Sequence, residues 1–271
     1  MEREVLTAAE AAVLETFVVP RYLAAFASVA LDMMLVGEGV GVAHVGCRTG
    51  HPDRRLLEKS PNCRVVGVDH SPAAVELARN KAATLPQAAL EYHVAQSYPS
   101  VLPSSAFSHA LTLHPVGGVA ERKAIFSEMK RVLYARGQAL ISMPLRGSFQ
   151  ELMDLFREYS LKYDEGEFAE TIELAAASRL SIETLAEELE DVGFADVDVE
   201  LVSTELTFSG GRAFIEDPTT RLLVVPDLES SLGDYDLTSP LAYVCDAIDE
   251  YWSESDFGLT VKIGCASARK R

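Results

Sequence analysis

The chain has 271 residues, which is enough to bury a full hydrophobic core as one domain or as one domain with a cap. Apolar residues make up 48% of it and charged residues 24%, a composition typical of a soluble globular protein. No uninterrupted apolar run approaches the roughly 20 residues that a membrane span needs, and the N-terminus lacks the basic start and apolar core of a signal peptide. We therefore expect a cytoplasmic protein with no membrane partner.

The net charge of −17 is unevenly distributed along the chain. Residues 1–150 hold 15 Lys and Arg against 13 Asp and Glu, whereas residues 151–271 hold 9 against 28, a balance of −19. Such a charge asymmetry bears on binding partners rather than on the fold, and it disfavours nucleic acid and anionic lipid as partners. Two interpretations stay open for the acidic half: a surface that promotes solubility, or a docking surface for a basic protein or a cationic substrate.

The first 36 residues predict two helices, at 7–18 and 21–36, with Pro20 at their junction. Strands and helices then alternate. Strands are expected at 40–45, 64–68, 90–95, 108–113 and 138–143, and helices at 51–59, 72–84 and 120–134. This alternation predicts an α/β fold with a doubly wound, mostly parallel sheet.

The pattern changes after residue 144. Helices are expected at 148–162, 168–179, 181–193, near 211–222 and near 240–253, with strands at 197–208 and 259–266. We expect the helical insertions on either side of the penultimate strand to pack together as an acidic lid over the carboxyl ends of the strands, where such sheets bind ligands. The domain prediction is N-terminal helices over 1–36, a cofactor-binding core over 37–146, and the remaining strands with the lid over 147–271.

Cysteine and histidine spacing gives no sign of a metal site. Cys47, Cys63, Cys245 and Cys265 form no C-x-x-C pair, which predicts free thiols rather than zinc ligands or disulfides. The six histidines show no recognised ligand spacing either.

The segment that carries chemistry is the turn Gly-Cys-Arg-Thr-Gly at 46–50, which follows the first apolar strand and precedes a predicted helix. Asp69 ends the next strand. Glycines let the backbone approach a nucleotide, and an acid at the end of the following strand can bind ribose hydroxyls. The spacing is not the G-x-G-x-x-G of dinucleotide enzymes, so an NAD-dependent oxidoreductase is disfavoured.

This turn resembles the glycine loop of class I S-adenosylmethionine (SAM) methyltransferases. Residues 65–79 are similar to the second strand and following helix of that family, and residues 129–142 to the helix, turn and fifth strand often written R-V-L-x-P-G-G. The resemblance covers about residues 20–145 in order. It is closest in kind to the methyltransferase type 11-like group, with degenerate motifs. It implies a seven-stranded sheet, SAM as cofactor, and methyl transfer.

The resemblance also implies residue roles. Backbone amides at 47–50 would face the methionyl carboxylate at a helix start, Asp69 would accept the ribose hydroxyls, and His70 would pack beside the adenine. Gln96 stands where an acid would receive the adenine amino group. The implied cofactor-binding set is Gly46, Cys47, Arg48, Gly50, Asp69, His70, Gln96 and Ser97.

His114, just past the fourth strand, is the candidate general base. Residues at that place face the methyl acceptor in this fold, and a histidine near its reference pKa of about 6.5 can accept a proton at neutral pH. The structural alternative is an ordinary loop histidine before Pro115. For Asp69 the alternative is a residue that caps the next helix, and for the two glycines a tight turn without a ligand.

Four positions depart from the family's pattern. His44 replaces an acid, Arg48 replaces the middle glycine, and Gln96 and Ser108 replace further acids. A pocket with fewer acids offers less favourable electrostatics to the sulfonium and ammonium of SAM. Two hypotheses follow: a SAM-dependent methyltransferase that transfers a methyl group in line to a small-molecule or acyl-type acceptor, or a catalytically inactive methyltransferase-like protein that serves as a binding or scaffold partner.

Overall fold

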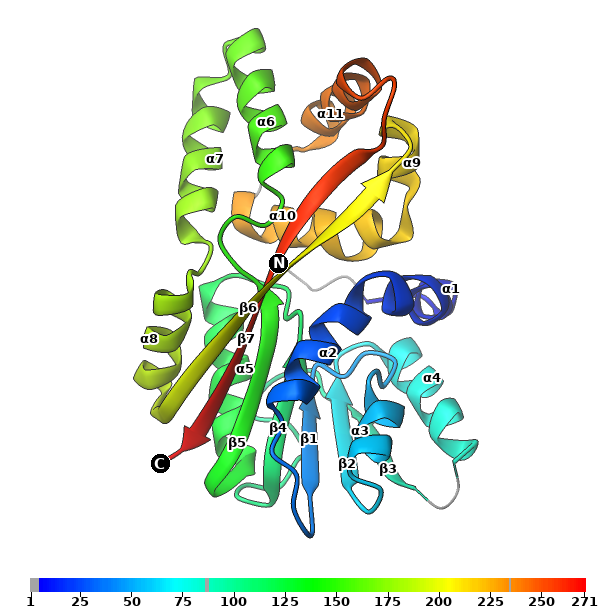
Figure 1. The fold of residues 1–271 in the computed structure, drawn as a ribbon, viewed down its shortest axis with the longest axis vertical. Coiled ribbons are helices and arrows are strands. Elements are labelled where there is room, and N and C mark those ends of the chain that lie inside the picture. The colour runs from blue at the N-terminus through cyan, green and yellow to red at the C-terminus, as the bar shows by residue number, and fades with distance from the viewer. Residues whose placement is uncertain (1–4, 86–87, 234) are drawn as a thin grey trace.

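The computed structural model describes residues 5–85, 88–233 and 235–271 (Figure 1). One seven-stranded sheet forms its centre, with strand order β3-β2-β1-β4-β5-β7-β6. Neighbouring strands are parallel from β3 to β5, and β7 pairs antiparallel with both β5 and β6. The doubly wound, mostly parallel sheet is therefore confirmed. The strands are β1 Gly41–Val45, β2 Arg64–Asp69, β3 Ala89–Val94, β4 Phe107–Leu113, β5 Leu133–Pro144, β6 Phe194–Phe208 and β7 Phe257–Lys270.

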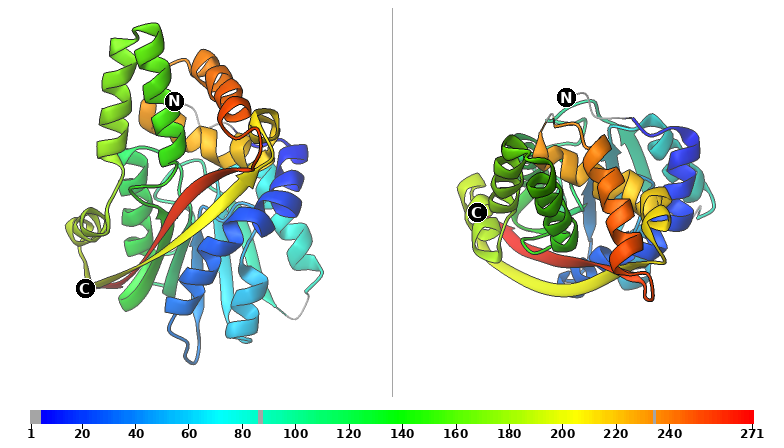
Figure 2. Two further views of the ribbon diagram at one scale, coloured as in Figure 1. Left: turned by 45° about the horizontal axis from the view of Figure 1, so that its top comes forward. Right: turned by 90° about the horizontal axis from the view of Figure 1, so that it is seen from above.

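Burial along the strands follows from their place in the sheet. Every residue of the central strand β4 is buried, because helices cover both faces of a doubly wound sheet. Along the edge strand β3 the burial varies from residue to residue, with Tyr92 buried and Glu91 exposed. Helices α2 Ala24–Met33, α3 Asp53–Lys59 and α4 Pro72–Ala83 cover one face, and α5 Val119–Val132 covers the other together with α8 Ile182–Val192 (Figures 1 and 2).

The N-terminal helices differ from the expectation. Helix α1 Ala8–Val13, the π-helix η1 Leu14–Leu23 and α2 Ala24–Met33 form one continuous helical stretch, so the predicted break at Pro20 is wrong. Pro20 lies inside η1. Proline has no backbone N–H to donate, and the wider π register accommodates this loss without ending the helix.

By length and composition alone, Ala8–Met33 could cross a membrane, a test that a core helix of a soluble protein also passes. In this structure most apolar side chains of η1 and α2, Tyr22 and Phe26 among them, lie in the hydrophobic core, whereas Phe17 is exposed.

Two further boundaries were misplaced. Strand β5 begins at Leu133, so it includes the turn that was expected to separate helix from strand. The single helix expected near 211–222 is interrupted: α9 Gly211–Glu216 ends before Pro218, and η2 Thr220–Val224 then continues without a break into α10 Val225–Leu232. Pro218 separates α9 from η2 because a helix ends at or before the residue that precedes a proline. Pro226 lies where η2 passes into α10, and as at Pro20 the π register accommodates the missing N–H without ending the helix.

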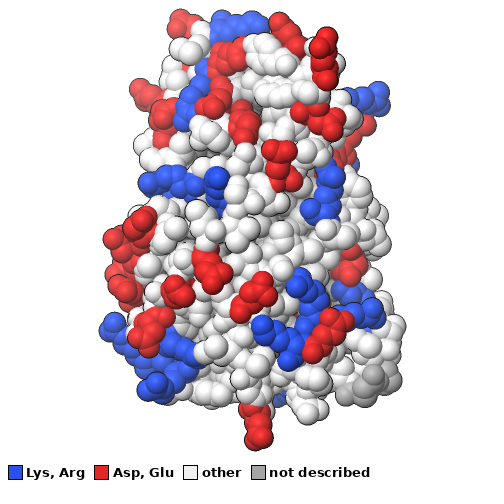
Figure 3. Space-filling model, in the orientation of Figure 1, with Lys and Arg blue, Asp and Glu red and all other residues white. Residues whose placement is uncertain are grey.

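The remaining helices lie beyond the carboxyl ends of the strands (Figures 1 and 2). We define the lid as α6 Gln150–Tyr163, α7 Gly166–Ser178, α9, η2, α10 and α11 Thr238–Tyr251. Helix α11 packs on α6 and α9, and α10 packs on α7, so the two helical insertions contact each other. Acidic side chains are frequent on the lid, and basic ones gather at the foot of the sheet, in the face shown in Figure 3.

The contact between α9 and α11 can be tested at Gly211, where a Cβ would lie 2.1 Å from the carbonyl oxygen of Cys245. We expect Gly211→Ala to destabilise the protein by about 2 kcal/mol or more, because overpacking forces backbone shifts. Gly166→Ala is the matched control, because its Cβ would meet nothing within 4 Å. Urea unfolding measures both free energies, and equal stabilities of the two variants would contradict this packing.

Candidate functional site

The glycine loop lies where the strand order reverses. Connections leave β1 and its neighbour β4 in opposite directions, which opens a crevice at their carboxyl ends, the usual ligand site of such sheets. Residues 46–50 follow β1 at this crevice. Gly46 (φ +72°) and Gly50 (φ +77°) are in the left-handed region, so these two positions favour glycine. A Cβ on Gly50 would also lie 2.9 Å from the hydroxyl oxygen of Tyr92.

Backbone amides of the loop donate hydrogen bonds within the protein. Gly46 and Cys47 both donate to the carbonyl oxygen of Val68, at 2.9 and 3.0 Å, and Gly50 donates to that of Cys47 at 2.8 Å. The loop is thereby tied to β2. Helix α3 begins at Asp53, later than the predicted residue 51, so the loop does not run directly into a helix N-terminus.

Asp69 lies at the carboxyl end of β2, as predicted, and is 4% exposed. Its Oδ2 accepts the backbone N–H of Arg48 at 2.9 Å, and its Oδ1 accepts that of Ser71 at 2.9 Å. The imidazole of His70 lies 3.5 Å from Oδ1. A carboxylate offers about four lone-pair positions, so Asp69 can accept further hydrogen bonds from a ligand.

Arg48 lies across the crevice. Its backbone is left-handed (φ +47°), a conformation that the family's glycine would adopt without strain. Its Nη1 donates to the carbonyl oxygen of Leu113 at 2.7 Å, and Nη2 donates to that of His114 at 2.7 Å. The side chain therefore joins the β1 loop to the end of β4.

Little space remains around the loop. The cavity there measures about 10 Å³. It is lined by Leu14, Val19, Leu23, His44, Gly46, Cys47, Arg48, Thr49, His51 and Leu113. Such a volume holds about one water molecule, whereas small-molecule sites measure roughly 300–1,000 Å³. The crevice is thus closed by its own side chains in this conformation.

Helix η1 is held over the loop by a cluster of charged groups that the sequence reasoning missed. Thr49 Oγ1 donates to Glu15 Oε2 at 2.6 Å, and Lys81 Nζ lies 2.6 Å from Glu15 Oε1. Lys81 also donates to the carbonyl oxygen of Thr49 at 2.8 Å. Glu15 therefore joins three segments: η1, the loop and α4.

A second missed group lies beneath the loop. His44 Nδ1 is 3.3 Å from Asp53 Oδ1, and the hydroxyl of Tyr92 donates to Asp53 Oδ2. His44 and Asp53 are at most 2% exposed. Burial, and then the Asp53 carboxylate, raise the pKa of the Tyr92 hydroxyl well above its ordinary value. The sequence feature that could have revealed this group is Asp53 itself, an acid in the first turn of the helix after the loop, nine residues beyond His44.

His114 lies at the end of β4 as expected, but it is fully buried. Its Nε2 is hydrogen-bonded to the Tyr22 hydroxyl at 2.9 Å, and its Nδ1 has no hydrogen-bond partner within residues 5–85, 88–233 and 235–271. Burial lowers the pKa of His114 to about 4. The imidazole is therefore neutral at pH 7 and a weaker base than its reference pKa suggested.

The other candidates lie at different distances from the loop. Gln96 and Ser97 are exposed and follow Ala95, whose N–H donates to the carbonyl oxygen of Asp69 at 2.8 Å, so they lie near the end of β2. Cys47 is buried, and desolvation raises the pKa of its thiol. Ser108 lies at the amino end of β4, where its hydroxyl donates to the carbonyl oxygen of Gly41 at 3.0 Å, on the edge of the sheet opposite the crevice.

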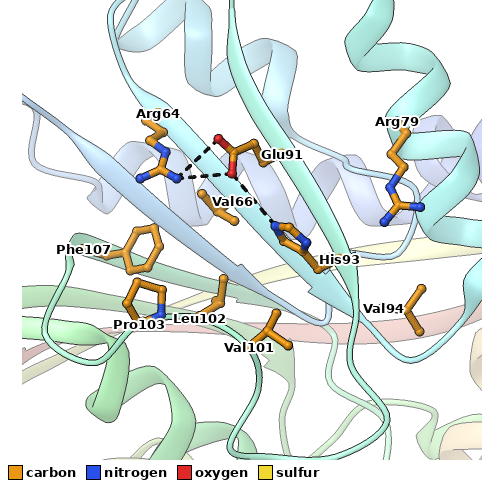
Figure 4. Close-up of a pocket in the computed structure, with 10 residues that line it drawn as sticks. All are labelled: Arg64, Val66, Arg79, Glu91, His93, Val94, Val101, Leu102, Pro103 and Phe107. Atoms are coloured by element: carbon orange, nitrogen blue, oxygen red, sulfur yellow. Dashed lines mark hydrogen bonds and ion pairs between the residues drawn. The ribbon is translucent and has the colours of Figure 1, made fainter.

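A hollow of about 440 Å³ elsewhere on the molecule is lined by none of the predicted site residues (Figure 4). It lies between β2, β3 and the connection to β4, which contains no helix. Its polar wall includes Arg64 and Glu91, 3.2 Å apart and each more than half exposed. The hollow is the solvated face of an edge strand and is separate from the crevice.

Comparison with known proteins agrees with the fold. Residues 42–137 match a family model described as "Methyltransferase domain". No curated protein matches the chain.

Solved structures match nearly the whole chain. The YcgJ protein of Bacillus subtilis superposes with a TM-score of 0.58 at 12% identity, covering 92% of this chain and 99% of that one. Phosphoethanolamine N-methyltransferase 2 of Haemonchus contortus, solved with SAM, gives 0.59 at 17% identity, covering 99% of this chain and 58% of that protein. Geranyl diphosphate methyltransferase, solved with GPP and sinefungin, gives 0.51 at 16%, covering 92% and 77%.

The depressed pKa of His114 predicts a loss of stability in acid. Because the unfolded histidine binds a proton near pH 6.5 and the folded one only near pH 4, stability falls as pH drops through that window. We expect His114→Gln to abolish about 2 kcal/mol of the stability lost between pH 7 and pH 5. Urea unfolding at both pH values measures this loss, with exposed His93→Gln as control. An unchanged pH dependence in His114→Gln would argue against a buried neutral imidazole.

Proposed function

We propose that this chain is a SAM-dependent methyltransferase acting on a small-molecule or acyl-type acceptor, because residues 42–137 match a methyltransferase-domain model and the fold matches that of solved methyltransferases. One observation carries the proposal: the glycine loop and the Asp69 carboxylate meet at the carboxyl ends of β1 and β2, beside the crevice between β1 and β4. This is where a doubly wound sheet binds a nucleotide.

The hydrogen-bonding groups of the crevice match those that SAM needs. The cavity, however, can hold SAM only after a conformational change. Asp69 keeps acceptor positions for the ribose hydroxyls, and the half-buried His70 lies beside it for the adenine. The cavity of about 10 Å³ is far smaller than a nucleotide. Binding therefore requires the Arg48 side chain or η1 to move away from the crevice.

When bound, SAM supplies a methyl group on a positively charged sulfur. The chain's own residues would orient and enclose it: Asp69 holds the ribose, while η1 and the lid exclude water. Such alignment in a dry site is the main contribution that a protein makes to an in-line displacement.

The environment of His114 supports an acyl-type acceptor. A histidine with a pKa of about 4 removes protons poorly at neutral pH. A carboxylate is already deprotonated there and needs no base, whereas an alcohol does. The lid over the carboxyl ends of the strands suits an enclosed small acceptor better than a polymer.

The closed crevice favours a second candidate function, a non-catalytic scaffold. In that case the acidic second half of the chain, with its balance of −19, would dock a basic protein. For either function we propose a cytoplasmic location, supported by the free thiols of Cys47, Cys63, Cys245 and Cys265, which a reducing compartment preserves.

Calorimetry with SAM and with S-adenosylhomocysteine (SAH) tests the proposal. We expect binding of both ligands, weakened about 10- to 100-fold by Asp69→Ala, because hydrogen bonds to a charged acceptor contribute about 1.5–3 kcal/mol. Glu76→Ala removes an exposed acid on α4 and is the control. Circular dichroism checks that each variant folds.

The scaffold hypothesis predicts a different result. A well-folded protein that binds neither ligand, and does not bind after Arg48→Gly, would contradict the methyltransferase proposal.

A further inference from the structure

Tyrosine side chains gather on the lid, where α6 and α11 pack together (Figure 1). Tyr159 and Tyr163 lie on α6, and Tyr243 and Tyr251 lie on α11. The ring centroids of Tyr163 and Tyr243 are 6.1 Å apart, and the two rings stand at 89° to each other. The Tyr159 ring lies 4.9 Å from Tyr163 and 5.7 Å from Tyr243. We call these four tyrosines, together with Glu158, the tyrosine cluster.

The cluster contains a carboxylate. Oε1 of Glu158 accepts a hydrogen bond from the Tyr243 hydroxyl at 2.6 Å and another from the Tyr251 hydroxyl. These two hydrogen bonds lower the pKa of Glu158, so its side chain is negatively charged at neutral pH. Burial, and then the hydrogen bond to Glu158, raise the pKa of the Tyr243 hydroxyl, which therefore stays neutral. The cluster thus combines aromatic faces with one fixed negative charge, which is an environment that attracts cations.

The chain's own ammonium group already lies there. Nζ of Lys162 is 4.8 Å from the ring centroid of Tyr243 and 5.9 Å from that of Tyr163, within the range of a cation–π interaction. Lys162 also acts electrostatically on Glu158, one turn earlier on α6. Lys162 is exposed and Tyr163 is 54% exposed, so solvent reaches the cluster. Because a lysine stem is flexible and its ammonium is strongly hydrated, Lys162 can give up this place to another cation.

We propose that the tyrosine cluster is a binding site for a trimethylammonium group and that Lys162 is its exchangeable occupant. A primary ammonium has three N–H donors to satisfy, whereas a trimethylammonium presents methyl groups that pack directly on aromatic faces. The acidic second half of the chain, with its balance of −19, draws cations toward the lid. The cluster shares no residue with the lining of the crevice, so this binding is independent of SAM.

NMR spectra of protein with labelled tyrosine rings, recorded during titration with tetramethylammonium chloride, test the proposal. We expect saturable shifts of the ring signals of Tyr163 and Tyr243. Binding should be about fivefold tighter in Lys162→Gln, which removes the competing ammonium, and about fivefold weaker in Tyr163→Leu, which removes one aromatic face. Glu158→Gln keeps an acceptor for both hydroxyls but loses the charge, so it should also weaken binding.

Two exposed residues provide matched controls. Lys123→Gln removes a positive charge on α5, and Tyr134→Leu removes an aromatic ring on β5, so both variants should bind as the wild type does. Ammonium chloride at the same concentrations controls for ionic strength and should give no saturable shift.

Choline and an N-acetyl-trimethyllysine amide distinguish two sources of the group, a small molecule and a side chain of a partner protein, by which of them binds more tightly. Absence of a saturable shift in Lys162→Gln would overturn the proposal. The same affinity in wild type, Lys162→Gln and Tyr163→Leu would overturn it as well. Neither result would affect the proposed function, because SAM binding is measured separately.

Discussion

The site depends on the bridge that Arg48 forms between the β1 loop and the end of β4. Its backbone N–H is held by Asp69 on β2, and its guanidinium is held by the carbonyl oxygens of Leu113 and His114. One residue thus joins three strand ends at the point where a doubly wound sheet opens. The same contacts that order the loop also close the crevice, so ligand binding and loop order are coupled.

Most of the fold was predictable because its signals are local and repeated. Apolar runs that end in glycine or an acid, with amphipathic segments between them, specified β1 to β5 and the helices that connect them. The continuity of the N-terminal helix through Pro20 was not predictable, since the π register of η1 depends on tertiary packing in the core, which sequence periodicity does not record. The break between α9 and η2 was signalled by Pro218 and missed because the apolar spacing continues across it.

The site was predictable in position and less so in chemistry. The loop at 46–50 and Asp69 lie together as expected, because parallel strands end at the same edge. The partners of Arg48 could not be foreseen, since its side chain reaches carbonyl oxygens 65 and 66 residues away. The pKa of His114 depends on its burial against Tyr22 of η1 and Phe26 of α2, which is a tertiary property. Asp53 was overlooked because its role depends on tertiary contacts: its carboxylate lies beneath the loop, where it contacts His44 and Tyr92.

A crystal structure of the chain with SAH would test the central claim, that Arg48 closes the nucleotide crevice, most directly. The account predicts ribose hydroxyls on the Asp69 carboxylate and the Arg48 guanidinium displaced from the carbonyl oxygens of Leu113 and His114. A ligand bound in the crevice while Arg48 keeps both of those hydrogen bonds, or a ligand bound elsewhere on the molecule, would contradict it.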